Sequence, residues 1–195
     1  MKVIKEFIVP TVILFAICFV AALLLGLTND VTAPKIAENA AKAQQEAMAF
    51  VLPDAAEFDE EAAENENGIY YTAYDKDGNV IGYAVTATGK GGYDGDITLM
   101  VGITADGAVN ELPDGSPAIS FLEESETPSV GGKLKKKADF LVQFAGLTGS
   151  AALTKNGGTV DAVTGATKTS TGITDAVNNA LLCYSKINKE VSANG

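Results

Sequence analysis

The pattern of apolar and polar positions separates a long apolar run near the N-terminus from a remainder in which both kinds of residue mix. The run Phe7–Leu27 contains no Asp, Glu, Lys or Arg. As a helix it would extend roughly 30 Å, which matches the hydrocarbon core of a membrane. A cleaved signal peptide usually has a shorter apolar core, about 7–15 residues, and a cut after Ala33 would leave Pro34 beside the scissile bond. We therefore predict a single transmembrane helix over residues 7–27, with a signal peptide as the alternative.

The lysines beside this run indicate its direction across the membrane. Lys2 and Lys5 precede the run, and only Lys35 follows it closely. Because positively charged flanks stay on the cytoplasmic side, we expect residues 1–6 in the cytoplasm and the remainder of the chain outside it.

Residues 28–53 are predicted to form a helical stalk. Pro34 suits the first turn of a helix, apolar residues then recur at helical spacing, and the residue before Pro53 resists the helical conformation. The next stretch, residues 54–67, is acidic and contains no lysine. We expect it to be a solvated loop with some helix.

From Gly68 onward the pattern changes to one typical of β-strands. β-branched and aromatic residues dominate short runs, and Asp77-Gly78 is a hairpin signal between two of them. The predicted strands cover residues 69–74, 80–88, 97–104, 118–122 and 159–163.

Two helices are predicted in the C-terminal part. The first covers residues 133–144 and begins with a run of lysines. The second follows from an apolar stripe repeating every three or four positions. That stripe consists of Ile173, Ala176, Val177, Ala180, Leu181 and Tyr184. Antiparallel hairpins with helices on one face make an α+β domain, which we place at residues 54–195.

The composition excludes several kinds of chemistry. All 14 cationic residues are lysines, 25 residues are acidic, and the net charge is −11. This negative charge argues against general nucleic-acid binding. The chain has no histidine, and Cys18 and Cys183 fall in the predicted span and the last helix. A histidine base, a His-ligated metal, a four-cysteine cluster and an internal disulfide are therefore not expected, and redox chemistry would need a borrowed cofactor.

Hydroxyl residues crowd the segment from Asp161 to Thr171, directly before the last helix. One interpretation is a Thr or Ser helix cap with a glycine turn. The other is an anion site, because the amides and the dipole at a helix N-terminus favour phosphate. The chain lacks arginine, so backbone amides and Lys168 are the natural partners of such a phosphate. The residues alone leave both interpretations open.

The pattern made by Asp161, Thr164, Gly165, Ala166 and Thr167 resembles the flavinylation motif of the FMN-binding domain family. The resemblance implies that an ApbE-type flavin transferase attaches FMN through its phosphate to Thr167. In that family Ser often stands where this chain has Thr164.

Two further segments are similar to the same family. They are the glycine-rich run beginning at Gly89, with the strand after it, and the loop 126–131. The resemblance implies that Tyr93, Glu126 and Thr127 lie near the flavin ring. On the residues alone, Tyr93 is an ordinary loop aromatic and Glu126 a surface acid. Ser129 replaces the usual Gly of that loop, which alters its expected shape.

The chain as a whole is similar to the G subunits of Rnf electron-transport complexes. The shared order is one N-terminal span, a stalk and a C-terminal flavinylation motif; the related C subunit of sodium-translocating NADH:quinone reductase is usually longer. The resemblance implies a membrane-bound flavoprotein subunit, not catalytic alone. It would relay electrons between reduced ferredoxin and NAD, together with other subunits that move Na⁺ or H⁺. The alternatives are an anchored binding or sensor module without flavin, and a stand-alone extracellular flavin reductase.

Overall fold

The structure, a computed structural model, describes residues 2–93, 95–124 and 138–194. It contains two compact units, Met1–Ala43 and Gln44–Gly195. The predicted flavin neighbours Glu126 and Thr127, and the lysine run that begins the predicted helix 133–144, lie outside the described residues.

The N-terminal helix α1 runs without a break over Lys2–Val51 and includes Pro10 and Pro34. Within the described part of the chain, one helix, α1, is long enough and apolar enough to cross a membrane. The apolar window of α1 is fully exposed. The separate helix start predicted at Pro34 is wrong. A proline removes one amide donor and strains a helix, but here the helical backbone continues past it.

The second unit is built on one antiparallel sheet, with strand order β1-β3-β4-β5-β6 and β2 also paired with β3. The strands are β1 (Glu57–Phe58), β2 (Ala63–Asn65), β3 (Gly68–Tyr74), β4 (Val80–Gly89), β5 (Ile97–Thr104) and β6 (Ile119–Glu124). The central pairing of β4 with β5 runs from Gly82–Thr104 to Gly89–Ile97. The predicted α+β class and the predicted strands from residue 69 to residue 122 are confirmed.

Two local predictions were wrong. The acidic stretch 54–67 contributes β1 and β2, because both short segments pair with the edge of β3. Residues 159–163 form no strand and contribute only a single bridge between Val160 and Leu153. In both places the pairing depends on a partner elsewhere in the chain, which local residue pattern does not encode.

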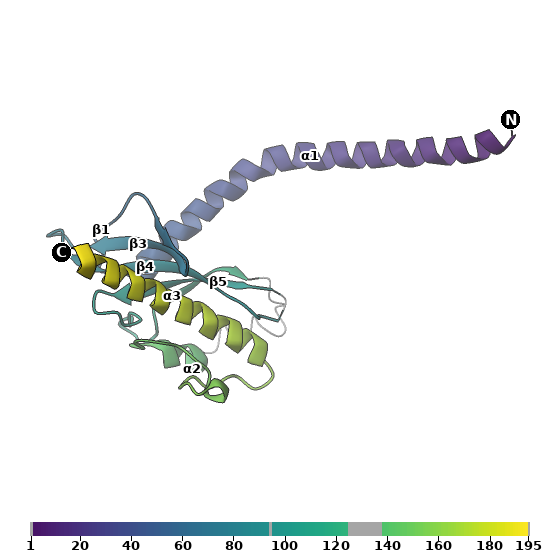
Figure 1. The fold of residues 1–195 in the computed structure, drawn as a ribbon. Coiled ribbons are helices and arrows are strands. Elements are labelled where there is room, and N and C mark those ends of the chain that lie inside the picture. Colours follow the sequence, from purple (N-terminus) through teal and green to yellow (C-terminus); the bar gives the residue numbers. More distant parts are fainter. Residues whose placement is uncertain (1, 94, 125–137, 195) are drawn as a thin grey trace. The chain divides into compact units, whose positions relative to one another are not determined.

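The long C-terminal helix α3 (Thr167–Asn194) crosses one face of the sheet, as Figure 1 shows. Alternate residues of β5 point to this face, where they are buried with apolar residues of α3. The residues of this core from the two elements are Ile97, Leu99, Val101, Ile103, Ile173, Ala176, Val177, Ala180, Leu181, Cys183 and Ile187. The predicted apolar stripe of the last helix is therefore its buried face.

The opposite face of the sheet is covered by the last two turns of α1. Ala47, Val51 and Leu52 are buried there with Met100. Gly102 permits this packing, because a Cβ at that position would collide with the Val51 carbonyl oxygen. The same carbonyl accepts a 2.9 Å hydrogen bond from the Asn110 side chain. The expectation of helices on one face only was wrong, because the end of α1 is part of the domain.

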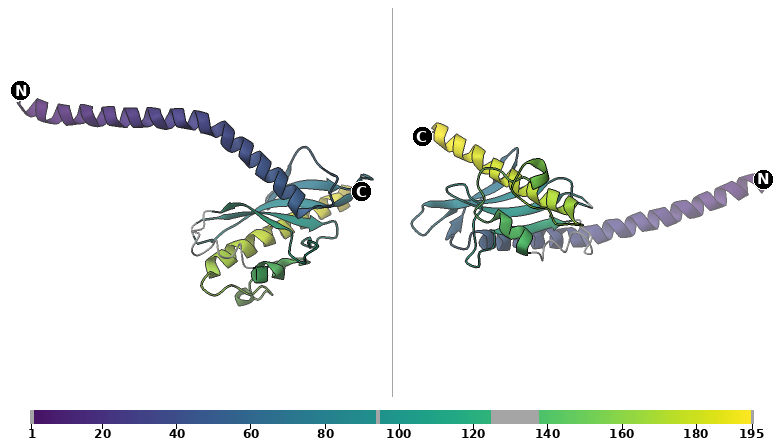
Figure 2. Two further views of the ribbon diagram at one scale, coloured as in Figure 1. Left: turned by 180° about the vertical axis from the view of Figure 1, so that it is seen from behind. Right: turned by 90° about the horizontal axis from the view of Figure 1, so that it is seen from below.

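A short helical segment completes the α3 side of the domain. It consists of α2 (Ala138–Leu141) followed by the 3₁₀ turn η1 (Val142–Phe144), and Figure 2 shows α2 on the same side of the sheet as α3. The rings of Phe140 and Phe144 are both buried and meet edge to face at 5.4 Å. This aromatic pair joins the core beneath α3 and fixes the residues between them.

Candidate functional site

The hydroxyl-rich segment makes a tight turn directly into α3. The Ala166 amide donates to the Val163 carbonyl at 3.0 Å, and Gly165 has a φ of 83°, a conformation that glycine adopts without strain. The Ser170 amide then donates to the Ala166 carbonyl at 2.9 Å. Amides before this bond have no acceptor within the helix. The backbone amides of Thr167 and Lys168 therefore form the N-terminal end of α3.

A buried hydroxyl fixes this turn against the helix. Ser170 is fully buried, accepts a 3.1 Å hydrogen bond from the Val163 amide and donates a 3.0 Å hydrogen bond to the Ala166 carbonyl. One side chain thus holds both ends of the Val163–Ala166 turn. The role of Ser170 was not predicted from the sequence, although Ser170 belongs to the hydroxyl-rich segment and lies three residues after Thr167.

Asp161 stands at the beginning of the segment, and its backbone is held by one glutamine. The Asp161 amide donates to Oε1 of Gln143 at 2.7 Å, and Nε2 of Gln143 donates to the Asp161 carbonyl at 3.2 Å. The Asp161 side chain is exposed. Sequence reasoning also missed Gln143, and nothing in the sequence connects it with Asp161.

The glycine-rich loop after β4 lies against the first turns of α3. The Lys90 amide donates to the Asp175 carboxylate at 2.8 Å. A Cβ on Gly172 would lie 3.1 Å from the Gly92 nitrogen, so helix and loop are in close contact. The Lys168 ammonium lies 5.9 Å from the centroid of the Tyr93 ring. The structure therefore brings together two predicted site residues that are far apart in the sequence.

The side chains of the motif are open to solvent. Thr164, Gly165, Thr167 and Lys168 are exposed, and Ala166 is half-buried. Tyr93 is 54% exposed. A second cation approaches from the 3₁₀ turn η2 (Thr154–Asn156), because the Lys155 ammonium is 3.5 Å from the hydroxyl of Thr171. Sequence reasoning missed Lys155, since only the fold places this turn beside α3.

The donor set at this helix end fits a phosphate ester of FMN. It offers backbone amides at the positive end of a helix dipole, two lysines and an exposed threonine hydroxyl. A phosphodiester on Thr167 would keep one negative charge, which these groups stabilise. Because Thr167 is exposed, an attached group would displace no core side chain.

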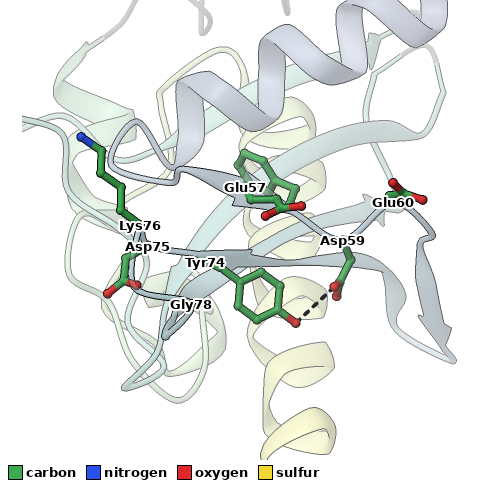
Figure 3. Close-up of a pocket in the computed structure, with 8 residues that line it drawn as sticks. Glu57, Asp59, Glu60, Tyr74, Asp75, Lys76 and Gly78 are labelled. Atoms are coloured by element: carbon green, nitrogen blue, oxygen red, sulfur yellow. Dashed lines mark hydrogen bonds between the residues drawn. The ribbon is translucent and has the colours of Figure 1, made fainter.

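A cavity of about 460 Å³ lies away from this site, at the β1 edge of the sheet, and is shown in Figure 3. Its side chains are mainly acidic, and the Tyr74 hydroxyl donates to the Asp59 carboxylate at 3.1 Å. Desolvation, together with this hydrogen bond to the carboxylate, raises the pKa of Tyr74. Among the residues that the structure describes, no cluster of His, Cys, Asp or Glu is arranged to hold a metal ion. This edge lies near the C-terminal end of α3, whereas the hydroxyl-rich segment leads into its other end (Figure 1).

Comparison with known proteins identifies two parts of the chain. Residues 92–182 match the model of the FMN-binding domain, and residues 1–51 match that of the RnfG N-terminal region. The first match begins in the glycine-rich loop and includes the whole segment that leads into α3. With the apolar helix α1, these matches define a single-pass membrane protein with an FMN-binding domain.

Relatives that match most of the chain identify the family to which it belongs within this class. The chain is 36% identical to the G subunit of the ion-translocating oxidoreductase complex of Methanosarcina acetivorans, over 91% of this chain and 94% of that protein. It is 33% identical to the G subunit of the Na⁺-translocating ferredoxin:NAD⁺ oxidoreductase complex of Acetobacterium woodii, over 91% of each chain. It is 30% identical to the G subunit of the proton-translocating ferredoxin:NAD⁺ oxidoreductase complex of Clostridium ljungdahlii, over 84% of each. The chain belongs to the family of G subunits of ion-translocating oxidoreductase complexes.

Proposed function

We propose that this chain is an electron-relaying subunit of an Rnf-type membrane complex, which couples ferredoxin:NAD oxidoreduction to Na⁺ or H⁺ transport. Its membership of the family, and the names of its relatives, support this function. Bound FMN would supply one- and two-electron redox chemistry that the side chains lack. The chain itself would bind the flavin, hold it at the start of α3 and fix its place in the complex.

We further propose that FMN is covalently attached to Thr167. The observation that carries this proposal is the position of Thr167, exposed at the first residue of α3 and after a turn fixed by Ser170. Lys168 and Lys155 would offset the charge of the phosphate, Thr164, Gly165 and Ala166 would form the turn, and Tyr93 would lie beside the flavin.

The attachment requires an activated phosphate, which a flavin dinucleotide supplies. The Thr167 hydroxyl oxygen forms a bond to the phosphorus on the flavin side, and the bond from that phosphorus to the bridging oxygen breaks. The hydroxyl proton passes to a base, and a nucleoside monophosphate leaves with the electron pair of the broken bond. No atom changes oxidation state. We assign the catalysis to an ApbE-type flavin transferase, with Asp161 as the acidic residue of its recognition segment.

In the proposed arrangement, residues 1–6 are cytoplasmic, residues 7–27 span the membrane, and residues 28–43 form the stalk. Residues 44–195, which include the end of α1 packed on the sheet, form the extracytoplasmic FMN-binding domain. Lys2 and Lys5 ahead of the span support this direction. A covalent bond suits such a place, because a flavin lost outside the cytoplasm is not readily replaced.

Intact-mass measurement after co-expression with a flavin transferase tests the attachment. The expected product has the mass of the chain plus one FMN less one water, and the flavin remains after denaturation. Thr167→Ala should abolish this increment and leave the melting temperature close to that of the unmodified chain. Thr159→Ala is the matched control, since it removes another exposed threonine, two residues before the motif begins, and should still accept flavin. Retention of the increment in Thr167→Ala would contradict the assignment.

A further inference from the structure

We infer that Gln143 is a positioning residue for flavin attachment, acting through the backbone of Asp161. This inference rests on the proposed attachment of FMN to Thr167. Gln143 belongs to η1, on a different element from the motif and 18 positions before Asp161. It reaches the motif only through the fold.

The side-chain amide of Gln143 engages the Asp161 backbone in both directions. Its oxygen accepts a 2.7 Å hydrogen bond from the Asp161 amide, and its nitrogen donates a 3.2 Å hydrogen bond to the Asp161 carbonyl. Only a side chain with a donor and an acceptor in one plane makes both bonds. Together they fix the position and the orientation of one residue, as a neighbouring β-strand would.

The glutamine is itself held in place. It lies between Phe140 and Phe144, whose buried rings pack against each other within the core under α3. Its nitrogen also lies 3.3 Å from the Phe140 carbonyl oxygen. The core therefore determines where Gln143 points, and Gln143 in turn determines where Asp161 lies.

The segment before Thr167 is consequently held at both ends. Ser170 fixes the Val163–Ala166 turn from the helix side, and Gln143 fixes Asp161 from the η1 side. The backbone that carries the exposed Asp161 carboxylate is thereby held in place relative to the start of α3, where Thr167 lies. A transferase that must engage both groups in one active site would meet them already arranged, and loss of such an arrangement lowers rates steeply.

The role is separable from stability. Asp161 is exposed, so water can replace the two hydrogen bonds when Gln143 is removed. A glutamine that only stabilised the fold would change the melting temperature and leave the attachment rate of folded protein unaltered. Loss of a glutamine that positions Asp161 would lower the attachment rate of folded protein and leave the melting temperature nearly unchanged.

The test measures attachment of flavin to the purified, detergent-solubilised full chain by a flavin transferase, with flavin dinucleotide as donor. Gln143→Met keeps the side-chain length but makes neither hydrogen bond, and Gln143→Glu keeps the acceptor alone. We expect Gln143→Met to lower kcat for attachment by about tenfold or more, with KM for the chain unchanged, and Gln143→Glu to fall between it and the wild type. Gln44→Met is the matched control, because Gln44 is also half-buried and bonds one partner, the Tyr71 hydroxyl at 2.9 Å.

The outcomes separate this inference from the proposed function. If the wild-type chain accepts no flavin, or Thr167→Ala accepts it equally, the proposed attachment fails. If the wild type is flavinylated at Thr167 and both folded Gln143 variants react at its rate, the positioning role alone is wrong. Hydrogen exchange of the Asp161 amide in the wild-type chain gives a reading that needs no variant. We expect protection there, and exchange as fast as that of an unstructured peptide would overturn the inference.

Discussion

Gly89, at the end of β4, lies directly against Gly172 in the second turn of α3. A Cβ on Gly89 would collide with the Gly172 carbonyl oxygen, and a Cβ on Gly172 would come within 2.9 Å of Ile97. The two glycines therefore let the helix approach the sheet closely at the point where the glycine-rich loop begins. This approach sets Tyr93, on that loop, beside Lys168 at the start of the helix.

We predict that Gly89→Ala destabilises the domain by roughly 1–3 kcal/mol, because the added methyl group forces helix and strand apart. The free energy of unfolding of the second unit, measured by urea denaturation, checks this. Thr88→Ala is the control on the same strand, since its side chain is exposed, and it should change stability much less. Equal stability of Gly89→Ala and the wild type would mean that the close approach is not needed.

Asp161→Ala should slow flavin attachment and leave the melting temperature nearly unchanged. The carboxylate is exposed, whereas the Asp161 backbone is held by Gln143 whatever its side chain. The measurement is the flavinylated fraction by intact mass at fixed times. Asp139→Ala, which removes another exposed carboxylate from nearby α2, should react like the wild type. Full attachment in Asp161→Ala at early times would remove this residue from the recognition segment.

The direction of the domain is testable with thiol chemistry. Cys183 is buried and Cys18 lies in the apolar helix, so Asp77→Cys in a Cys18→Ala background adds one exposed thiol at the β3–β4 turn. A membrane-impermeant maleimide should label this thiol on intact cells. A cysteine introduced at Lys2 should react only after lysis. The reverse pattern would place the domain in the cytoplasm.

The purified chain alone should move no ions. The run Phe7–Leu27 carries no ionisable side chain apart from Cys18, and one helix cannot enclose a polar path through lipid. We expect the flavinylated chain in liposomes to be reduced by dithionite yet to produce no Na⁺ uptake and no pH change when electrons are supplied. Ion movement by the chain without its partner subunits would refute the proposed role as a relay.

The sequence predicted those elements whose pattern is local. The stripe that includes Ile173 and Leu181 indicated a helix and its buried face, and hairpin signals located the central strands. The end of α1 was assigned to a stalk, because burial of Val51 depends on Gly102 about fifty residues later. β1 and β2 were missed because their residues favour solvent and pair only with an existing edge.

The residues of the candidate site also fall into two groups, those that the local sequence predicted and those that only the fold brings to the site. The motif that ends at Thr167 is contiguous and carries a resemblance, so it could be found from the sequence. Gln143 and Lys155 belong to short turns of ordinary composition, and only tertiary contacts join them to the motif. Ser170 lies between these cases, because it is close in sequence but its two hydrogen bonds need the turn at Gly165.

The exposure of Thr167 bears on the order in which this protein matures. Its side chain belongs to neither core, and the turn before it is fixed by residues of the chain itself. The polypeptide can therefore complete its fold before any cofactor reaches it. On the proposed topology, export through the membrane, folding and flavin loading become successive steps. The unloaded chain would then be a stable intermediate that waits for its cofactor and is not committed to degradation.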